Sequence, residues 1–251
     1  VISGHAGGAL LTLPRERRTL LLSCGVDQAR ALPVGRRFLG LEPETFFTRY
    51  LVGKYKAGAL LVGRDFAFGR NRAGHLDFLR RACEERGIPL FVLPFVSRKG
   101  HKISSSALRQ LVHEGDMPAA AQQLGRHYSI TGKVVHGRKL GRKLGFPTAN
   151  LSVDARKLLP CGVFAAKARL GREVFGAVVN IGLRPTLKTG VRELVPEAHL
   201  LDFSRDIYGR ELEVLLLKKL RGERKFSGLD ALSAQMKKDA SSARKILKFY
   251  A

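Results

Sequence analysis

Residues 137–150 form the segment whose residue types and spacing most clearly suggest chemistry. They read GRKLGRKLGFPTAN, so Gly137, Gly141 and Gly145 recur every four residues among basic side chains. Glycines let a backbone approach an anion closely, and backbone N–H groups and nearby cations can then bind phosphate oxygens. The order G-x-x-x-x-G-K-[ST] of a Walker loop is absent, so a phosphate site here would belong to another architecture. A glycine-rich hairpin with a solvated basic rim explains the spacing equally well.

The end of the same segment adds oxygen ligands. Pro147 is followed by the hydroxyl of Thr148 and, two residues later, by the amide oxygen of Asn150. Hard oxygen ligands of this kind suit Mg²⁺. The segment therefore predicts a site for phosphate and magnesium.

Two groups of polar residues in the first half stand where an α/β fold places ligands. Asp65, Phe66, Phe68 and Arg72 follow a short apolar run, and ligands of α/β sheets gather at the carboxyl ends of the strands. A second group opens a helical pattern, where hydroxyls, N–H groups and a guanidinium can hold a triphosphate; it consists of Ser104, Ser105, Ser106 and Arg109. Serines at a helix start serve equally well as plain N-caps.

The pattern around these residues predicts an α/β fold for the first half. Apolar residues recur at helical spacing over 43–51 and 75–83, and the runs 57–63 and 88–93 are typical of buried strands. This β–α–β order predicts a parallel sheet covered by helices. Two more helical stripes are expected over 104–124, with a break at Gly115 and Asp116.

The pattern changes near Tyr128. Short strand-like runs then follow one another without helices between them, at 129–135, 162–168, 174–179, 197–201 and 211–216. Such runs predict a small antiparallel barrel or sandwich. A final helix is expected over 229–250. We therefore expect two domains, residues 1–128 and 129–251.

Composition limits the class of protein. The 251 residues carry 45 Lys and Arg against 21 Asp and Glu, a net charge of +24, and 45% of the residues are apolar. The apolar content allows one or two cores and disfavours disorder. The charge attracts polyanions, so nucleic acid, acidic membranes and phosphorylated small molecules are all candidate partners. Apolar runs too short for a membrane span, and three widely spaced cysteines, lead us to expect a soluble, cytoplasmic protein.

Several motifs, in order, resemble one enzyme family. The stretches G-R-x-L-G-F-P-T-A-N at 141–150, N-I-G-L-R-P-T at 180–186, E-A-H-L-L-D-F at 197–203 and D-I-Y-G at 206–209 closely resemble the riboflavin kinase module. Residues 62–74 and 103–109 resemble the FMN adenylyltransferase module of the bifunctional prokaryotic FAD synthetases. The resemblance runs from about Leu10 to the C-terminus.

The resemblance implies an α/β plus β architecture. A Rossmann-like nucleotidyltransferase domain would be followed by a small antiparallel β-barrel riboflavin kinase domain with a C-terminal helix. The implied reaction is the phosphorylation of riboflavin to FMN by ATP with Mg²⁺, and the family's second activity adenylylates FMN to FAD. We expect a monomer or weak homo-oligomer that binds riboflavin, FMN and ATP, with no nucleic acid and no membrane.

The resemblance also implies roles for single residues. Glu197 becomes the candidate base for the ribityl 5′-hydroxyl, on a strand whose alternation makes an inward carboxylate feasible, and Arg244 becomes a flavin contact. Without the resemblance, a surface carboxylate and a solvated helix arginine are the plainer interpretations. ATP and its phosphates are expected to contact Gly137, Gly141, Arg142, Gly145, Pro147, Thr148 and Asn150, and Thr148 and Asn150 would also hold Mg²⁺. The adenylyltransferase-like half would use Asp65, Phe66, Phe68, Arg72, Ser104, Ser105, Ser106 and Arg109, whereas the turn at Asn180, Arg184 and Thr186 could be purely structural.

One part of the family pattern is absent. The adenylyltransferase module should open with an H-x-G-H signature whose histidines stabilise the phosphates of ATP, and the sequence contains no such motif. His5 is better explained as an exposed loop residue. We therefore expect adenylyltransferase activity to be impaired in this chain. Two alternatives stay open, a non-catalytic flavin- or nucleotide-binding protein and a basic nucleic-acid-binding protein.

Overall fold

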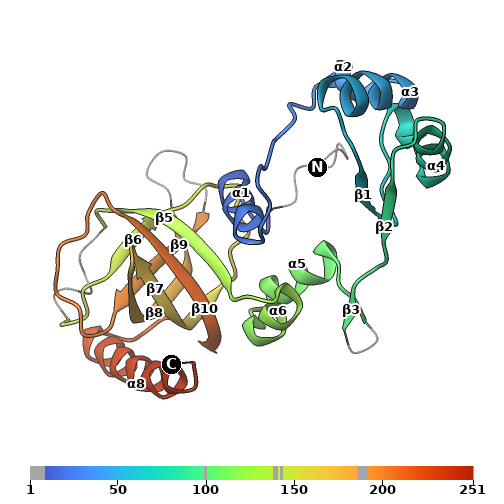
Figure 1. Ribbon diagram of the computed structural model, residues 1–251. Helices are drawn as coiled ribbons and strands as arrows, with labels where there is room; N and C mark the ends of the chain where they lie inside the picture. Colours follow the sequence, from blue (N-terminus) through green and yellow to red (C-terminus); the bar gives the residue numbers. More distant parts are fainter. Residues whose placement is uncertain (1–8, 99–100, 138–140, 142–143, 186–191, 251) are drawn as a thin grey trace. The chain divides into compact units, whose positions relative to one another are not determined.

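The computed structural model describes residues 9–98, 101–137, 141, 144–185 and 192–250 (Figure 1). His5, Arg142 and Thr186 lie outside these described residues. Contacts divide the chain into two compact units: residues 18–103 form one, and the residues up to Arg17 together with those from Ser104 onwards form the other. The expected domain boundary at residue 128 coincides with the start of the first barrel strand and stays a prediction.

The unit of residues 18–103 contains the predicted β–α–β arrangement. Strand β1 (Leu60–Gly63) pairs in parallel with β2 (Leu90–Leu93), and α4 (Leu76–Glu84) lies between them in the chain. The buried core of the unit consists of Phe47, Leu79, Ala82 and Cys83, against which one face of the sheet packs. The opposite face presents exposed apolar side chains, Leu61, Phe91 and Leu93.

The other elements of this unit are short. The helix predicted over 43–51 begins as α3 (Pro43–Phe46) and continues as a π-helix, η1 (Phe47–Lys54). The sequence did not predict the helix α2 (Arg36–Leu39), the 3₁₀ turn η2 (Arg70–Arg72), or the hairpin of β3 (Ser97–Arg98) and β4 (His101–Lys102).

Two helices precede the barrel, as the pattern over 104–124 predicted. Helix α5 (Ser105–Glu114) ends at Gly115, whose φ of 82° is left-handed and favours glycine. Helix α6 (Met117–Leu124) begins at once, because the Asp116 side chain accepts the backbone N–H of Ala119 at 3.1 Å.

A closed antiparallel barrel follows. The sequence had allowed either a barrel or a sandwich, and the structure shows the barrel. Its neighbour order is β10-β5-β6-β9-β8-β7, and β10 pairs with both β5 and β7 to close it (Figure 1). The strands are β5 (Tyr128–Val135), β6 (Ala149–Ser152), β7 (Gly162–Leu170), β8 (Glu173–Pro185), β9 (Arg192–Leu200) and β10 (Glu211–Arg221). Strand β6 was not predicted.

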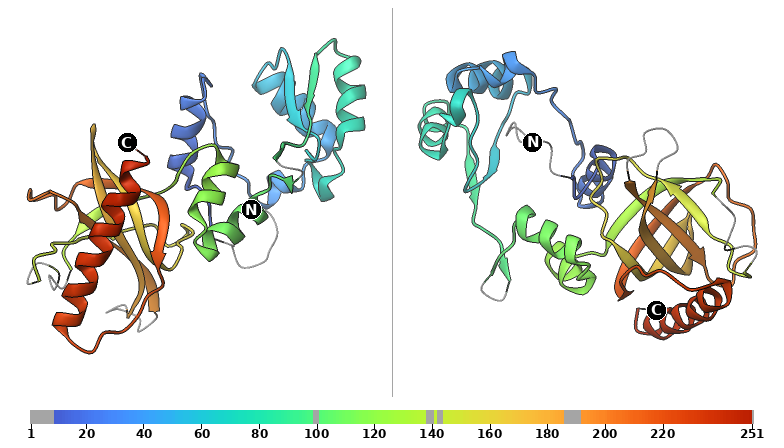
Figure 2. Two further views of the ribbon diagram at one scale, coloured as in Figure 1. Left: turned by 90° about the horizontal axis from the view of Figure 1, so that it is seen from below. Right: turned by 180° about the vertical axis from the view of Figure 1, so that it is seen from behind.

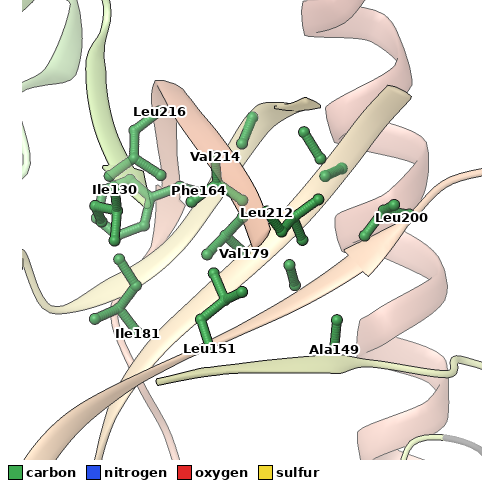
Figure 3. Close-up of a cluster of buried hydrophobic side chains, with 14 of the residues drawn as sticks. Ile130, Ala149, Leu151, Phe164, Val179, Ile181, Leu200, Leu212, Val214 and Leu216 are labelled. Atoms are coloured by element: carbon green, nitrogen blue, oxygen red, sulfur yellow. The ribbon is translucent and has the colours of Figure 1, made fainter. Parts of the chain in front are cut away.

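The barrel interior is filled with side chains from all of its strands. Ile130, Leu151, Phe164, Val179 and Val214 are buried and project into the same space (Figure 3). Successive residues of a strand point to opposite faces, so the neighbours of these residues face outward. A small barrel packed in this way leaves little room for a ligand inside it.

Helix α8 (Leu229–Lys248) packs along the outer wall over β7, β8 and β10 (Figure 2). Its buried Ala240 and Ala243 lie in one cluster with Ala165 and Leu201. These small side chains let the helix approach the sheet closely. The sequence predicted this helix over 229–250, two residues past its observed end.

A buried ion pair joins the start of α1 (Pro14–Ser23) to the barrel. The side chain of Lys157 is 1% exposed, and its Nζ lies 2.8 Å from Glu16 Oε2 and 2.9 Å from the carbonyl oxygen of Leu11. The same ammonium lies 4.6 Å from the ring centre of Tyr128, whose hydroxyl donates to the carbonyl oxygen of Leu158 at 2.7 Å. Burial lowers the pKa of Lys157 and raises that of Tyr128.

None of the helices in the described ranges combines the length and apolar composition that a membrane span requires.

Candidate active site

Glu197 lies within β9, with an asparagine opposite it on each neighbouring strand. Its cross-strand partner is Asn150 on β6 and Asn180 on β8. The adjacent Ala198 is fully buried in the barrel core, so Glu197 points to the outer face. The expectation of an inward carboxylate at the head of a strand was therefore wrong, because β9 begins five residues earlier, at Arg192, and its register turns Glu197 outward.

The Glu197 side chain lines a cavity of about 710 Å³. It lies between the outer face of the barrel, α8 and the segments on either side. Its polar lining residues are Thr148, Asn180, Arg184, Glu197, His199, Arg221, Glu223, Arg224, Lys225 and Asp239. Its apolar lining residues include Leu144, Phe146, Val163, Val178, Leu183, Phe226, Leu232 and Met236. Apolar walls together with convergent polar groups are the usual form of a small-molecule site.

A smaller cavity of about 240 Å³ adjoins the first. Thr148 lines both, so molecules bound in the two cavities could meet at its side chain. The smaller cavity is completed by Pro147, Ala149, Ala198, Leu200 and residues 203–208. Tyr208 is held in it by ring contact with His136, at 3.8 Å between centroids, and by its N–H, which donates to Asp206 Oδ1 at 2.9 Å.

The glycine segment supplies close packing beside the cavities. A Cβ on Gly137 would lie 2.2 Å from Asn150 Nδ2, and one on Gly141 would lie 2.3 Å from the carbonyl oxygen of Phe146. Gly145 adopts a φ of 80°. The Gly141 carbonyl accepts the N–H groups of Leu144 and Phe146, so these two N–H groups are used within the turn. The glycines are thus required by the turn itself and by the Asn150 side chain.

Thr148 and Asn150 fit a magnesium ion held mainly by a nucleotide. The carbonyl of Pro147 accepts a hydrogen bond from His199 Nδ1 at 2.9 Å, which ties the Thr148 segment to β9. The described side chains contain no group of three or more His, Cys, Asp and Glu that could hold a metal by themselves. Mg²⁺ bound through phosphates needs only one or two protein oxygens and keeps several waters. The hydroxyl of Thr148 and the amide oxygen of Asn150 match that requirement.

Arg184 lies between two carboxylates of the larger cavity. Its Nη1 is 2.9 Å from Glu223 Oε1, and its Nε is 3.5 Å from Glu197 Oε1. Glu223 Oε2 also accepts the backbone N–H of Leu183 at 3.3 Å. The sequence had left Arg184 in a turn with no necessary chemical role, whereas the structure places its side chain at the proposed base.

A second network of charged side chains also lines the larger cavity. The sequence analysis did not identify this network. The Arg221 guanidinium binds both carboxylate oxygens of Asp239, at 2.8 Å from Nη2 to Oδ2 and 3.2 Å from Nε to Oδ1. Asp239 also accepts from Gln235 Nε2 at 2.7 Å and is 5% exposed. Phe226 lies under the guanidinium groups of Arg221 and Arg224. The available signal was a charged residue, Asp239, on the apolar stripe of the predicted last helix.

Arg244 lines neither of these two cavities. Its Nη2 lies 2.7 Å from Asp202 Oδ1, and both side chains are exposed. A flavin contact for Arg244 stays a prediction.

The four candidate residues after β1 have different surroundings. The Phe68 ring packs against Phe46 and Phe78, at 4.9 and 5.8 Å between centroids, so it belongs to the core of its unit. Phe66 is partly exposed beside it. Asp65 lies 3.9 Å from the ammonium of Lys102, and Arg72 is exposed.

The candidates at the start of α5 belong to the other unit. Ser104 is an N-cap, since its hydroxyl accepts the N–H of Ala107 at 3.2 Å. Ser105 and Ser106 are exposed in the first turn, and Arg109 Nε donates to the carbonyl oxygen of Ala9 at 3.2 Å. None of the eight adenylyltransferase-like candidates lines either cavity.

Two family models match different parts of the chain. A riboflavin kinase family model matches residues 124–247, and a FAD synthetase family model matches residues 1–107. The bifunctional riboflavin kinase/FMN adenylyltransferase of Escherichia coli (strain K12) is 40% identical over 94% of this chain and 75% of the relative. The enzyme of the same name from Haemophilus influenzae is 36% identical over 96% and 78%.

A solved structure is also similar. A crystal structure described as a macrolide-efflux protein from Streptococcus pneumoniae superposes with a TM-score of 0.84 at 30% sequence identity. The superposition covers 93% of this chain and 75% of that one.

The barrel with its outer helix and paired cavities defines a riboflavin kinase fold, and it follows an α/β nucleotidyltransferase-like region. The chain belongs to the family of bifunctional riboflavin kinase/FMN adenylyltransferases, the prokaryotic FAD synthetases. The family resemblance and the fold class expected from the sequence are thereby confirmed.

Proposed function

We propose that this chain transfers the γ-phosphoryl group of ATP to the 5′-hydroxyl of riboflavin, giving FMN and ADP. The observation that carries the proposal is the pair of cavities that share Thr148, with Glu197 lining the larger one. Phosphoryl transfer between two bound molecules depends mainly on their positioning and on electrostatic stabilisation. Two adjoining sites, one of them lined by a carboxylate, are suited to that task.

The sizes and linings of the cavities support an assignment of the two substrates. The larger cavity combines aliphatic and aromatic side chains with polar and charged ones, and its apolar part suits the flat isoalloxazine ring of riboflavin. The smaller cavity, with Phe203 and Tyr208 beside Asp206, suits the adenosine part of ATP. The triphosphate would then run toward Thr148, with contacts from Gly137, Gly141, Arg142, Gly145, Pro147 and Asn150.

Glu197 is the proposed general base. Its carboxylate would accept the hydroxyl proton as the substrate oxygen bonds to the γ-phosphorus and the bond to the β,γ-bridging oxygen breaks, releasing ADP. Asn150 and Asn180, on either side of Glu197 in the sheet, would orient the hydroxyl by hydrogen bonding. Mg²⁺ held at Thr148 and Asn150 would neutralise charge on the phosphates.

Arg244 remains a proposed flavin contact. Its present partner, Asp202, is exposed, and an exposed ion pair is weak enough to be exchanged for a ligand. An Arg244→Gln change should raise KM for riboflavin and leave KM for ATP unchanged in steady-state assays. Unchanged KM values for both substrates would remove Arg244 from the site.

The test of the kinase proposal is direct. Incubation with riboflavin, ATP and Mg²⁺ should produce FMN, separable from riboflavin by chromatography. Glu197→Gln should lower kcat about 100-fold or more, the usual contribution of a general base. Glu211→Gln, an exposed carboxylate change on β10, is the matched control and should retain full turnover. No FMN from the unaltered chain, or full turnover of Glu197→Gln, would contradict the proposal.

For these 251 residues we further propose slow adenylylation of FMN. The sequence contains no H-x-G-H motif. Two of the residues expected to bind the triphosphate also have other partners: Ser104 caps a helix, and Arg109 donates to the carbonyl oxygen of Ala9. FMN with ATP and Mg²⁺ should give little FAD. Abundant FAD would contradict this part.

We place the reaction in the cytoplasm, in a monomer or weak homo-oligomer that needs no nucleic acid. The three cysteines are free, which suits a reducing compartment. Sedimentation at physiological salt, with and without duplex DNA, tests the state and the partner together. A stable high-order assembly or a tight DNA complex would contradict it.

A further inference from the structure

The backbone pairing between β6 and β9 stops at the pair Ala149–Ala198. One residue further in the same antiparallel register, Thr148 would stand opposite His199, but β6 begins only at Ala149. The residue before Thr148 is Pro147, which has no N–H to donate to a neighbouring strand. Among the described residues, the strand pairing that positions β6 therefore ends just short of Thr148, the residue that lines both cavities.

The side chain of His199 continues the connection to β9 beyond this point. Its Nδ1 lies 2.9 Å from the carbonyl oxygen of Pro147. A carbonyl oxygen can only accept a hydrogen bond, so Nδ1 must carry a proton in this contact, in the neutral ring and in the charged ring alike. The imidazole also contacts the ring of Phe146, at 5.3 Å between centroids and an interplanar angle of 67°. His199 thereby holds the two residues that directly precede Thr148.

His199 lies on the same face of the barrel as the groups proposed to carry the reaction. Residues two apart in a strand point to the same side, so His199 shares the outer face of β9 with Glu197. Both side chains line the larger cavity, as does Thr148. Because Thr148 also lines the smaller cavity, a movement of its segment would change how the two bound substrates meet. Group transfer is sensitive to such a movement, since a misplacement of about 1 Å can cost about 100-fold in rate.

We propose that His199 is a positioning residue for the nucleotide: through its Nδ1–H bond to the Pro147 carbonyl, it holds Thr148 where the phosphates of ATP must lie for transfer. This inference rests on the proposed kinase function and adds one residue to it. Since His199 lines the larger cavity, the competing role is a direct contact with riboflavin through Nε2. The two roles use different ring nitrogens, and substitutions can therefore separate them.

Amide substitutions distinguish the two nitrogens. In His199→Asn the amide nitrogen is bonded to Cγ, as Nδ1 is, and can still donate to the Pro147 carbonyl. In His199→Gln the amide lies one carbon further out, near the position of Nε2, and the donor at the Nδ1 position is lost. We expect His199→Gln to lower kcat about tenfold and to raise the Kd of ADP about fivefold, as for one lost hydrogen bond with some misplacement. His199→Asn should stay close to the unaltered chain in both values.

A ring without a donor provides a second variant. His199→Phe keeps an aromatic ring beside Phe146 but cannot bind the Pro147 carbonyl, so its Kd for ADP should rise as in His199→Gln. His113→Ala, which removes an exposed histidine of α5, is the matched control and should change neither kcat nor the Kd of ADP.

The measurements separate nucleotide binding from flavin binding and from turnover. Steady-state formation of FMN gives kcat, and calorimetric titration with ADP and Mg²⁺ gives the nucleotide Kd. Quenching of riboflavin fluorescence gives the flavin Kd, which should be nearly unchanged in His199→Asn and His199→Gln, and it shows that each variant retains a folded site. In the unaltered chain, long-range ¹H–¹⁵N NMR at mildly alkaline pH should show His199 with its proton on Nδ1. This last measurement tests the contact even where a variant fails to fold.

The outcomes are distinct. If the unaltered chain forms no FMN, the kinase proposal fails and this inference fails with it. If the unaltered chain is active, the inference alone is overturned by a proton on Nε2, by an unchanged Kd of ADP in His199→Gln, or by a His199→Asn variant as defective as His199→Gln. Weaker riboflavin binding in His199→Asn than in His199→Gln would identify a direct flavin contact instead. Weaker ADP binding in the Gln and Phe variants, with the Asn variant near the unaltered chain, supports the inference.

Discussion

Lys157 is a buried cation, and its effect on the stability of the fold depends on its partners. Its ammonium is bound by Glu16 and by the carbonyl of Leu11, and it lies against the ring of Tyr128. Burial of an ion is costly, and its pairing offsets that cost only while every partner is present. The contact fixes the first turn of α1 to the segment between β6 and β7.

Lys157→Met should therefore destabilise the barrel. The change leaves Glu16, 13% exposed, without its cation, and the expected loss in the free energy of unfolding is about 3 kcal/mol. Urea denaturation followed by circular dichroism measures it. Adding Glu16→Gln should recover part of the loss, and Arg156→Met, which breaks an exposed pair with Asp154, should have little effect. Equal effects of the Lys157 and Arg156 changes would contradict this prediction.

Tyr128 should ionise only when the chain unfolds. Burial raises its pKa well above the ordinary value of about 10, since the phenolate would be desolvated. The unfolded chain releases this proton at lower pH than the folded chain, so stability should fall as pH rises above about 10. Absorbance of tyrosinate near 295 nm should show a delayed step that Tyr128→Phe removes. A titration that Tyr128→Phe leaves unchanged would be inconsistent with this assignment.

At the scale of elements, α8 connects packing to binding. Its small residues Ala240 and Ala243 rest on the barrel, while Met236 and Asp239 line the larger cavity. A displaced helix should therefore affect both stability and flavin affinity.

Ala243→Leu tests that connection. Adding a larger side chain under the helix should cost about 1–3 kcal/mol of stability, and it should also raise KM for riboflavin. Thermal unfolding and steady-state kinetics measure the two effects. Ala234→Leu, on the exposed face of the same helix, should change neither. A loss of stability with an unaltered KM would separate helix packing from the site.

Elements with a clear period were predictable, and elements decided by distant partners were not. The parallel strands, α4 and α8 follow from apolar spacing in the sequence. The run Ala149–Ser152 has little strand character of its own and becomes β6 because it pairs with β5 and β9. The π-helix η1 was read as an ordinary helix, since the two forms share nearly the same apolar pattern.

The residues of the candidate site also divide into those that the sequence predicts and those that it does not. Thr148, Asn150 and Glu197 came from motifs, and the structure brings them together. The outward direction of Glu197 depends on strand register, which no local pattern reveals. The pairs Arg184–Glu223 and Arg221–Asp239 form only after β8, β10, the segment beyond β10 and α8 have assembled, so they could not be read from spacing.

At the scale of the molecule, each of the two compact units has a buried core of its own. We therefore expect thermal unfolding in two steps. Riboflavin should raise the barrel transition, by about 2.7 kcal/mol of stability at 100 times its Kd. Calorimetry measures both steps, and Lys157→Met identifies the barrel step by lowering it. A single cooperative transition would contradict independent units.

Closure of the barrel also determines when, during synthesis, its sheet becomes complete. The first strand, β5, is completed by the last, β10, so the sheet keeps an open edge until residue 221 has left the ribosome. Phe226 and Asp239, which line the larger cavity, are translated later still. The proposed kinase site can therefore form only after α8 has been made, and a ribosome that stalls before α8 would release a polypeptide unable to assemble it.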